Sequence, residues 1–224
     1  MLKRALNVQQ TGPTTFRIGR VEFDKQQRTI TLPALVHLRT QVVEYVLVTE
    51  SGKAYESLLT TDAKPVDVHL AFLLLGMGPV AVGGDLNQAA AVPASNAVTI
   101  EVTWEKEGRT VKHTLSELIL LTTESRPDEA PRLFAPREWL YNGSFSDSAG
   151  FVAQREGSIV SLIRDPAALV NNPRDDRDNH HIHFPNDKLL PAEDTPVRVI
   201  LRLPARADVP APPQPPPEAR RSPP

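Results

Sequence analysis

The alternation of hydrophobic and polar residues predicts a chain built mainly of β-strands. Residues 30–38 place an apolar side chain at every second position, which is typical of a half-buried strand. Residues 98–104 alternate in the same way, Glu107-Gly108 supplies turn residues, and 110–115 return, so a β-hairpin is expected there. Pro33 interrupts the first of these strands. Because proline has no N–H for a ladder, we expect an edge strand or a bulge at this point.

Residues 42–76 predict a strand, a turn, a second strand and a helix. Residues 42–49 are apolar on both faces apart from Glu44, Ser51-Gly52 can form a tight turn, and 54–60 return, which indicates a second hairpin. Thr61 or Asp62 is suited to cap the following helix, and Pro65 lies in its first turn. Residues 66–75 are apolar nearly all round, which favours a buried helix, and Gly76 is placed to end it.

The second half of the chain predicts further strands. Residues 138–145 and 150–163 are expected as strands around a turn at 147–150, Asp165-Pro166 begins a short helix to Val170, and 197–203 form the last strand. From Pro204 the chain is dominated by proline, alanine and charge and cannot bury an apolar set, so we expect a disordered tail with polyproline II character. Such a tail could also serve as an interaction segment for a proline-recognising partner.

Together these elements predict a β-rich α+β protein of two lobes. Each lobe consists mostly of antiparallel hairpins, with one buried helix in the first lobe and a short helix in the second. The expected divisions are an N-terminal extension (1–13), a first lobe (14–124) with its helix at 64–76, a linker (125–136), a second lobe (137–204) and a proline-rich tail (205–224).

Composition excludes several classes of function. The 224 residues carry a net charge of −2, and aromatic residues make up only 5%, so no basic patch interleaved with aromatics points to nucleic acid. The chain has no cysteine, which removes thiolate metal sites, iron–sulfur clusters and cysteine nucleophiles. No cofactor is expected. We also expect no transmembrane segment, because the longest apolar run is short and interrupted by Asp67, His69 and glycines.

Glu56 and His69 form the first candidate site. Glu56 lies on the strand that leads into the helix carrying His69, and a strand packed against its following helix could bring the two side chains together. A carboxylate–imidazole pair can act as a general base with its orienting group, or bind a metal together with a third ligand. No third ligand is visible in the sequence, so we favour a hydrogen-bonded, structural histidine.

His181 and His183 form a second candidate, for a metal. They follow an acidic run in the segment PRDDRDNHHIH, and on a strand they would share one face. The acidic residues lack the spacing of an EF-hand calcium loop. A solvated surface loop is the explanation we favour.

Residues 43–76, VEYVLVTESGKAYESLLTTDAKPVDVHLAFLLLG, resemble the YdjY-like domain family, uncharacterised bacterial proteins common in planctomycetes. Trp139, Gly143-Ser144, Glu156-Gly157 and the segment DPAAL from Asp165 resemble the C-terminal part of the same family. The resemblance implies no established activity. It suggests an exported or periplasmic protein, although this chain shows no signal peptide as given. The family often has His-Glu-Ser where this chain has Tyr55-Glu56-Ser57, so a histidine ligand is not available at position 55.

The sequence therefore favours a non-catalytic binding or assembly module whose ligand or protein partner is unknown. The alternative is a metal-dependent or hydrolase-like enzyme that uses Glu56 and His69.

Overall fold

A computed structural model describes residues 7–79, 94–122, 132–134 and 138–205. Most of the linker expected at 125–136, nearly all of the tail expected at 205–224 and the first residues of the N-terminal extension lie outside this part of the chain. Its helices and strands are β1 (Val8–Gln10), β2 (Thr15–Ile18), β3 (Val21–Asp24), β4 (Thr29–Val36), β5 (Tyr45–Thr49), β6 (Ser57–Thr61), α1 (Pro65–Leu74), β7 (Ala97–Lys106), β8 (Arg109–Thr114), α2 (Leu115–Leu118), β9 (Ile119–Leu121), β10 (Arg132–Leu133), β11 (Trp139–Tyr141), β12 (Ser146–Asp147), β13 (Gly150–Phe151), α3 (Val152–Glu156), β14 (Ser158–Ser161), β15 (Val170–Asn171), β16 (His183–Pro185) and β17 (Pro196–Arg202). Short 3-10 turns add η1 (Ala54–Glu56), η3 (Ala94–Asn96) and η4 (Asp175–Asp178).

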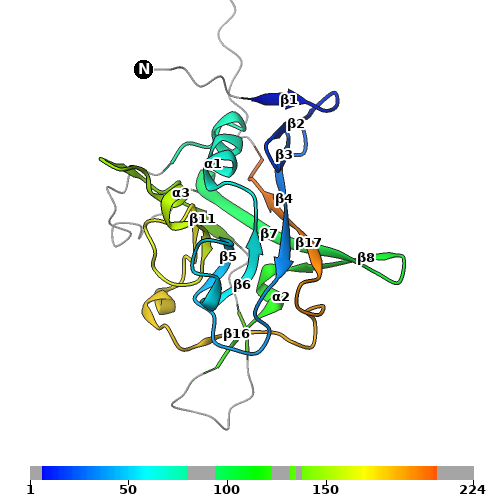
Figure 1. Cartoon of the computed structure of the whole chain (residues 1–224), viewed down its shortest axis with the longest axis vertical. Helices are drawn as coiled ribbons and strands as arrows, with labels where there is room; N and C mark the ends of the chain where they lie inside the picture. Colours follow the sequence, from blue (N-terminus) through cyan, green and yellow to red (C-terminus); the bar gives the residue numbers. More distant parts are fainter. Residues whose placement is uncertain (1–6, 80–93, 123–131, 135–137, 206–224) are drawn as a thin grey trace, which may run out of the picture.

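The main sheet closes on itself as an eight-stranded barrel (Figure 1). The ring runs β4-β17-β7-β11-β15-β14-β5-β6, and the pairing of β6 with β4 closes it. Strands β1, β2 and β3 continue the sheet beyond β4, and β8 pairs with β7 outside the ring. Closure removes most free strand edges, which would otherwise attract other chains.

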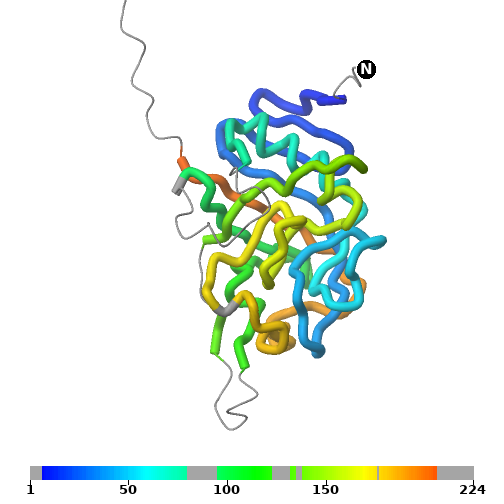
Figure 2. Tube along the Cα trace, turned by 90° about the vertical axis from the view of Figure 1, so that its left-hand side faces the viewer, coloured from blue at the N-terminus to red at the C-terminus, as the bar shows by residue number. Residues whose placement is uncertain are grey.

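The two-lobed fold expected from the sequence is wrong, although the β-rich α+β class is confirmed. Strands from the two halves of the chain are interleaved in one barrel: β17 lies between β4 and β7, and β14 pairs with β5 (Figure 2). Alternation along a strand shows which face is buried but not which strand lies beside it. Pairing each strand with its neighbour in the sequence gives two separate lobes, whereas the structure pairs strands that are far apart in the chain.

The barrel interior is filled by one alternating set of side chains from each long strand. In β4 and β17 every second residue is buried, and Val199 of β17 lies between Leu32 of β4 and Val102 of β7. Leu201 lies in the same way between Ile30 and Ile100. Each such aliphatic side chain contributes roughly 1.5–3 kcal/mol when fully buried, so this shared layer joins the two halves of the chain.

The hairpin expected over residues 42–60 is also wrong, because β5 and β6 are parallel. The chain does turn at Ser51-Gly52, where the Gly52 N–H donates to the Thr49 carbonyl. It then runs back through η1 before β6 starts beside Tyr45. A Cβ on Gly52 would lie 3.0 Å from the Glu156 carbonyl oxygen, so glycine allows this turn to pack closely against the end of α3.

The hairpin of β7 and β8 is confirmed, with Glu107 and Gly108 both at positive φ in a two-residue turn. Its outer part projects from the barrel as an arm (Figure 1). Beyond the arm, α2 begins with a capping box between Thr114 and Glu117.

Helix α1 is confirmed, but its N-cap is Lys64 rather than Thr61 or Asp62, and Pro65 occupies its first turn. Gly76 ends it with φ of 81°, donating to the Leu73 carbonyl, while the Met77 N–H donates to Phe72. This is a Schellman motif. The helix packs on β3, β4 and α3. Leu73 and Leu74 are exposed, so α1 is buried on one side rather than all round.

The short helix expected from Asp165 to Val170 does not form, because this segment is a loop that precedes β15. An Asp165 carboxylate oxygen accepts the Ala167 N–H at 2.8 Å, and this local bond competes with helix formation. The short helix of the second half is instead α3, which ends at Gly157 in the left-handed conformation.

Candidate functional site

The structure does not bring Glu56 and His69 together. Glu56 ends η1 immediately before β6, whereas His69 lies on α1, after the other end of that strand. A five-residue strand alone covers roughly 15 Å. Within the described residues, no hydrogen bond or ion pair links the two side chains. The two candidates therefore have separate surroundings.

His69 is a half-buried histidine held by aromatic neighbours. Its Nδ1 lies 2.9 Å from the hydroxyl of Tyr141 on β11, and its ring is 4.9 Å from that of Phe151. Burial lowers the pKa of His69 and raises the pKa of Tyr141. Both shifts favour neutral side chains, in which one tautomer of His69 accepts the tyrosine O–H. Phe72 stacks on Tyr141 at 3.9 Å, so this contact joins α1 to the barrel wall.

Glu56 lies among charged side chains at the opposite end of β6. Burial raises its pKa, the nearby Glu44 carboxylate raises it further, and Lys53 and His180 act in the other direction. His180 Nδ1 is 2.8 Å from a Glu44 oxygen, which pairs the loop after β15 with the start of β5. Sequence reasoning missed Glu44 and Lys53 as neighbours of Glu56, since contacts between loops leave no local pattern.

Beside Glu56, a buried polar network is centred on Tyr45 and Asp165. The Tyr45 hydroxyl donates to Asp165 at 3.1 Å and accepts from Lys53 Nζ at 2.5 Å. Burial and the Asp165 charge raise the pKa of Tyr45. The Asp165 main-chain N–H donates to Asn171. Tyr45 is fully buried, so this network fixes the DPAAL loop rather than offering a reactive group to a ligand.

The two metal candidates differ in burial. His183 is fully buried on β16, edge-on to Phe134 at 5.5 Å, whereas His181 lies in the exposed turn before the strand. The strand begins only at His183, so the expected shared face does not arise. Across the described residues, no group of three histidine, aspartate or glutamate side chains is arranged to hold a metal ion.

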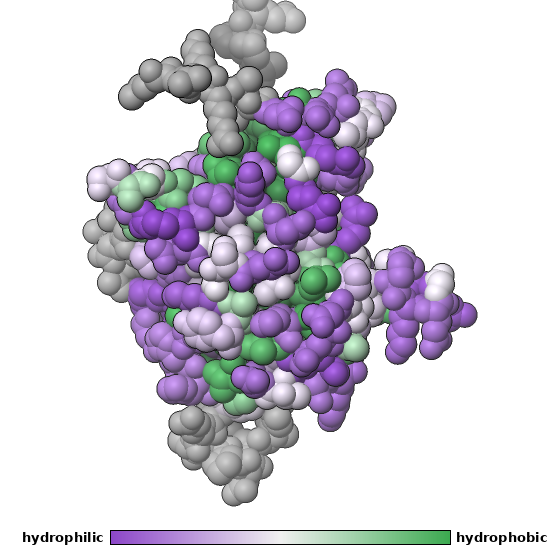
Figure 3. Space-filling view, in the orientation of Figure 1, coloured by the Kyte–Doolittle hydropathy of each residue, from purple (hydrophilic) through white to green (hydrophobic). Residues whose placement is uncertain are grey.

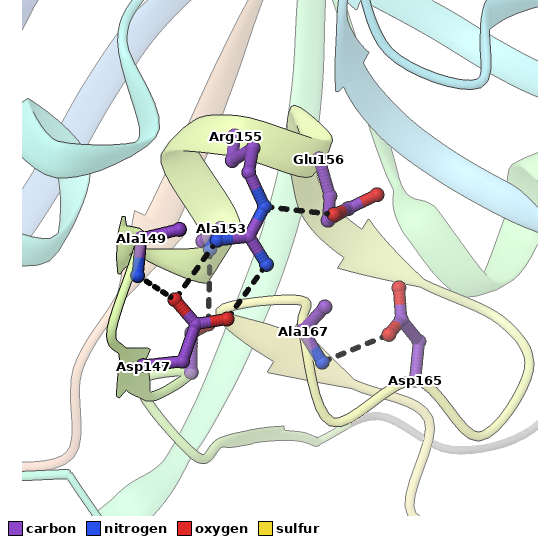
Figure 4. Close-up of polar contacts among 8 residues, drawn as sticks. Asp147, Ala149, Ala153, Arg155, Glu156, Asp165 and Ala167 are labelled. Carbon is purple, nitrogen blue, oxygen red and sulfur yellow. Dashed lines mark hydrogen bonds and ion pairs between the residues drawn. The ribbon is translucent and has the colours of Figure 1, made fainter.

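Figure 4 shows a second polar cluster, around the hairpin of β12 and β13. Arg155 of α3 binds both carboxylate oxygens of Asp147, at 3.0 and 2.9 Å, and this ion pair links the β12–β13 hairpin to α3. The Asp147–Arg155 ion pair lowers the pKa of Asp147. Ser144, with φ of 56°, accepts the Ala153 N–H. All these groups are satisfied by one another, which indicates a structural role.

A groove of about 320 Å³ opens in the barrel wall where β3 and β6 diverge on the same side of β4. We call it the arginine groove: Arg17, Arg20 and Arg198 line it, together with Glu22 and Pro33. Pro33 lies between the part of β4 that pairs with β3 and the part that pairs with β6, and its carbonyl accepts the Thr61 hydroxyl. The proline is thus neither on an edge strand nor in a bulge.

A model of the YdjY domain matches residues 21–202. The chain belongs to the YdjY domain family. The match begins at β3 and ends with β17, so it includes all eight strands of the barrel, while β1 and β2 precede it. No curated protein and no solved structure matches the chain. Among the described residues of this YdjY protein, no helix is long and apolar enough to cross a membrane.

Proposed function

We propose that this YdjY domain is a non-catalytic binding or assembly module. The observation that carries the proposal is the separation of Glu56 from His69: each has its own structural partners at a different end of β6. His69 pairs with Tyr141, and no carboxylate contacts it in the part of the chain that the structure describes. A general base needs its orienting group within hydrogen-bond reach.

The rival function, an enzyme that uses Glu56 and His69, requires the two groups to act in one site. Glu56 instead lies among Glu44, Lys53 and His180. The observed contacts therefore support two independent structural roles better than a shared reaction.

The proposal is tested with a panel of chromogenic ester, phosphate-ester and glycoside substrates. We expect the wild-type protein, E56Q and H69Q to show the same background rates. The thermal midpoint of each variant is measured as a control for folding. A turnover by the wild type that disappears in either variant, while the variant remains folded, would overturn the proposal in favour of an enzyme.

A further inference from the structure

The ion pairs of the arginine groove differ in geometry from the pairs of Arg155 with Asp147 and of Arg164 with Asp178. Arg155 and Arg164 each bind both oxygens of one aspartate through two nitrogens. Arg17 and Arg198 each use a single nitrogen, and both bind the same carboxylate, Glu22, at 2.5 and 3.2 Å. A guanidinium carries five N–H donors, so most donors of these two arginines remain available at the groove.

Arg17 and Arg198 share one carboxylate, that of Glu22, at the end of the groove beside Pro33. Both arginines lower the pKa of Glu22, so the carboxylate is ionised near neutral pH and already occupies the position of an anion between them. Arg20 also lines the groove and pairs with Asp62 through Nε alone.

The three arginines come from separate elements that the fold brings together. Arg17 lies on β2, Arg20 in the turn before β3 and Arg198 on β17. Arg17 and Arg20 precede the region matched by the family model, whereas Arg198 lies within it. The groove therefore depends on β2 and β3, which lie outside the ring of the barrel. It can bind a ligand that the ring strands alone would not hold. The face of the molecule in Figure 3 is mostly polar, with scattered apolar residues among the polar ones.

From this geometry we propose that the arginine groove binds a phosphate group through Arg17 and Arg198, with Arg20 also lining the groove. This proposal deepens the proposed function, on which it rests, by naming the chemical class of the ligand. Arginine presents planar pairs of N–H donors that match phosphate oxygens. A volume of about 320 Å³ accommodates a phosphate together with a small group attached to it.

The test measures binding of inorganic phosphate by calorimetry at low salt. We expect saturable binding that weakens about tenfold or more in R198Q and in R17Q, the loss expected for one charge-assisted hydrogen bond. The matched control is R202Q, which changes an arginine on the same strand that pairs with Glu101. Its affinity should equal that of the wild type.

The variant E22Q gives an effect of opposite sign. It removes the competing carboxylate while leaving both arginines in place, so phosphate should bind several-fold more tightly. Comparison of inorganic phosphate with glycerol 3-phosphate and with vesicles containing phosphatidic acid then separates a free anion, a small phosphomonoester and a lipid headgroup as the source of the phosphate.

Absence of binding by the wild type, or equal losses in R198Q and R202Q, would overturn the phosphate proposal. Neither result bears on the substrate panel with E56Q and H69Q, so the two proposals fail separately. Conversely, turnover that depends on Glu56 would leave the phosphate site intact and refute the non-catalytic function.

Discussion

At the scale of single residues, His69 illustrates how a side chain that suggests chemistry can serve the fold. The sequence correctly indicated a histidine on a largely apolar helix and favoured a hydrogen-bonded, structural explanation. It could not show that the partner is Tyr141, 72 positions further along the chain. Glu56 was paired with His69 because of its closeness in sequence, yet the length of β6 separates the two. Contacts of this kind depend on packing, which short patterns do not encode.

The contact between His69 and Tyr141 predicts a specific loss of stability. Y141F removes the hydroxyl and leaves the half-buried imidazole without this partner, so we expect the free energy of unfolding to fall by about 1 kcal/mol. Chemical denaturation at pH 7.5 measures the effect. An unchanged free energy would show that the bond contributes nothing to stability.

The lowered pKa of His69 predicts a pH dependence of stability. Because burial disfavours its protonated form, the unfolded chain binds this proton more readily than the folded chain does. The free energy of unfolding should therefore fall as the pH drops below about 6.5, the usual value for histidine, and this contribution should be absent above that pH. H69Q removes the effect, so its stability should change less than that of the wild type between pH 7.5 and 5.5.

Denaturation curves of H181Q, which alters an exposed histidine, provide the control for this pH dependence. The free energy of unfolding of H181Q should change between pH 7.5 and 5.5 by the same amount as that of the wild type. If H69Q and the wild type lose the same stability over this interval, burial of His69 is not the cause of the dependence.

At the scale of elements, local signals were reliable where local chemistry decides the structure. The β7–β8 turn follows from residues that adopt positive φ. The start of α1 at Pro65 follows from the fixed φ of proline, and its end at Gly76 follows from helix capping. The parallel pair of β5 and β6 could not be predicted in this way, since Ser51-Gly52 forms a turn in either arrangement. The loop at Asp165 shows the same ambiguity, because Asp-Pro is suited both to a helix start and to a turn.

The Schellman motif predicts different effects for two neighbouring glycines. G76A places a Cβ on a residue with φ of 81°, and we expect it to cost about 1–2 kcal/mol in the free energy of unfolding. In G78A the new Cβ meets no atom within 4 Å, so its stability should equal or slightly exceed that of the wild type. Thermal unfolding of both variants provides the comparison. Equal losses would mean that the left-handed conformation of Gly76 does not determine the cost.

The position of Pro33 predicts where β4 tolerates proline. Alternate residues of a strand direct their N–H and C=O groups to the same side. The Pro33 carbonyl points toward Thr61, so residues 31 and 35 also direct theirs toward β3 and β6. We expect P33A to change the free energy of unfolding by less than about 1 kcal/mol. T31P removes a ladder bond and leaves the β3 carbonyl unpaired, which should cost about 1–3 kcal/mol or more. If the two substitutions have similar effects in denaturation experiments, Pro33 does not lie at a position of β4 without a ladder partner between β3 and β6.

At the scale of the whole molecule, the sequence predicted the class of the fold but not its closure. Most strands of the ring were recognisable from period-2 alternation or apolar character, although β15 lies where a helix and a polar loop were expected. The ring itself depends on pairings such as β4 with β17 and β5 with β14. In a barrel every ring strand needs both neighbours to satisfy its main-chain groups. The arginine groove, too, appears only when β2, β3, β4 and β17 are assembled. No local pattern could indicate it.

Closure predicts that the first half of the chain does not fold alone. A fragment of residues 14–124, the expected first lobe, contains β4, β5, β6 and β7 but lacks β17, which separates β4 from β7, and β14, which pairs with β5. The fragment would expose the buried layer of Ile30, Leu32, Ile100 and Val102 together with unpaired strand edges. We expect a poorly dispersed amide spectrum and no cooperative thermal transition, whereas the full chain should unfold in a single transition. Mixing this fragment with residues 132–205 should restore the dispersed spectrum, because the complementary strands of the ring are then present. A dispersed spectrum of the isolated fragment would instead show that 14–124 is an independent lobe, and that the interleaved barrel is not required for it to fold.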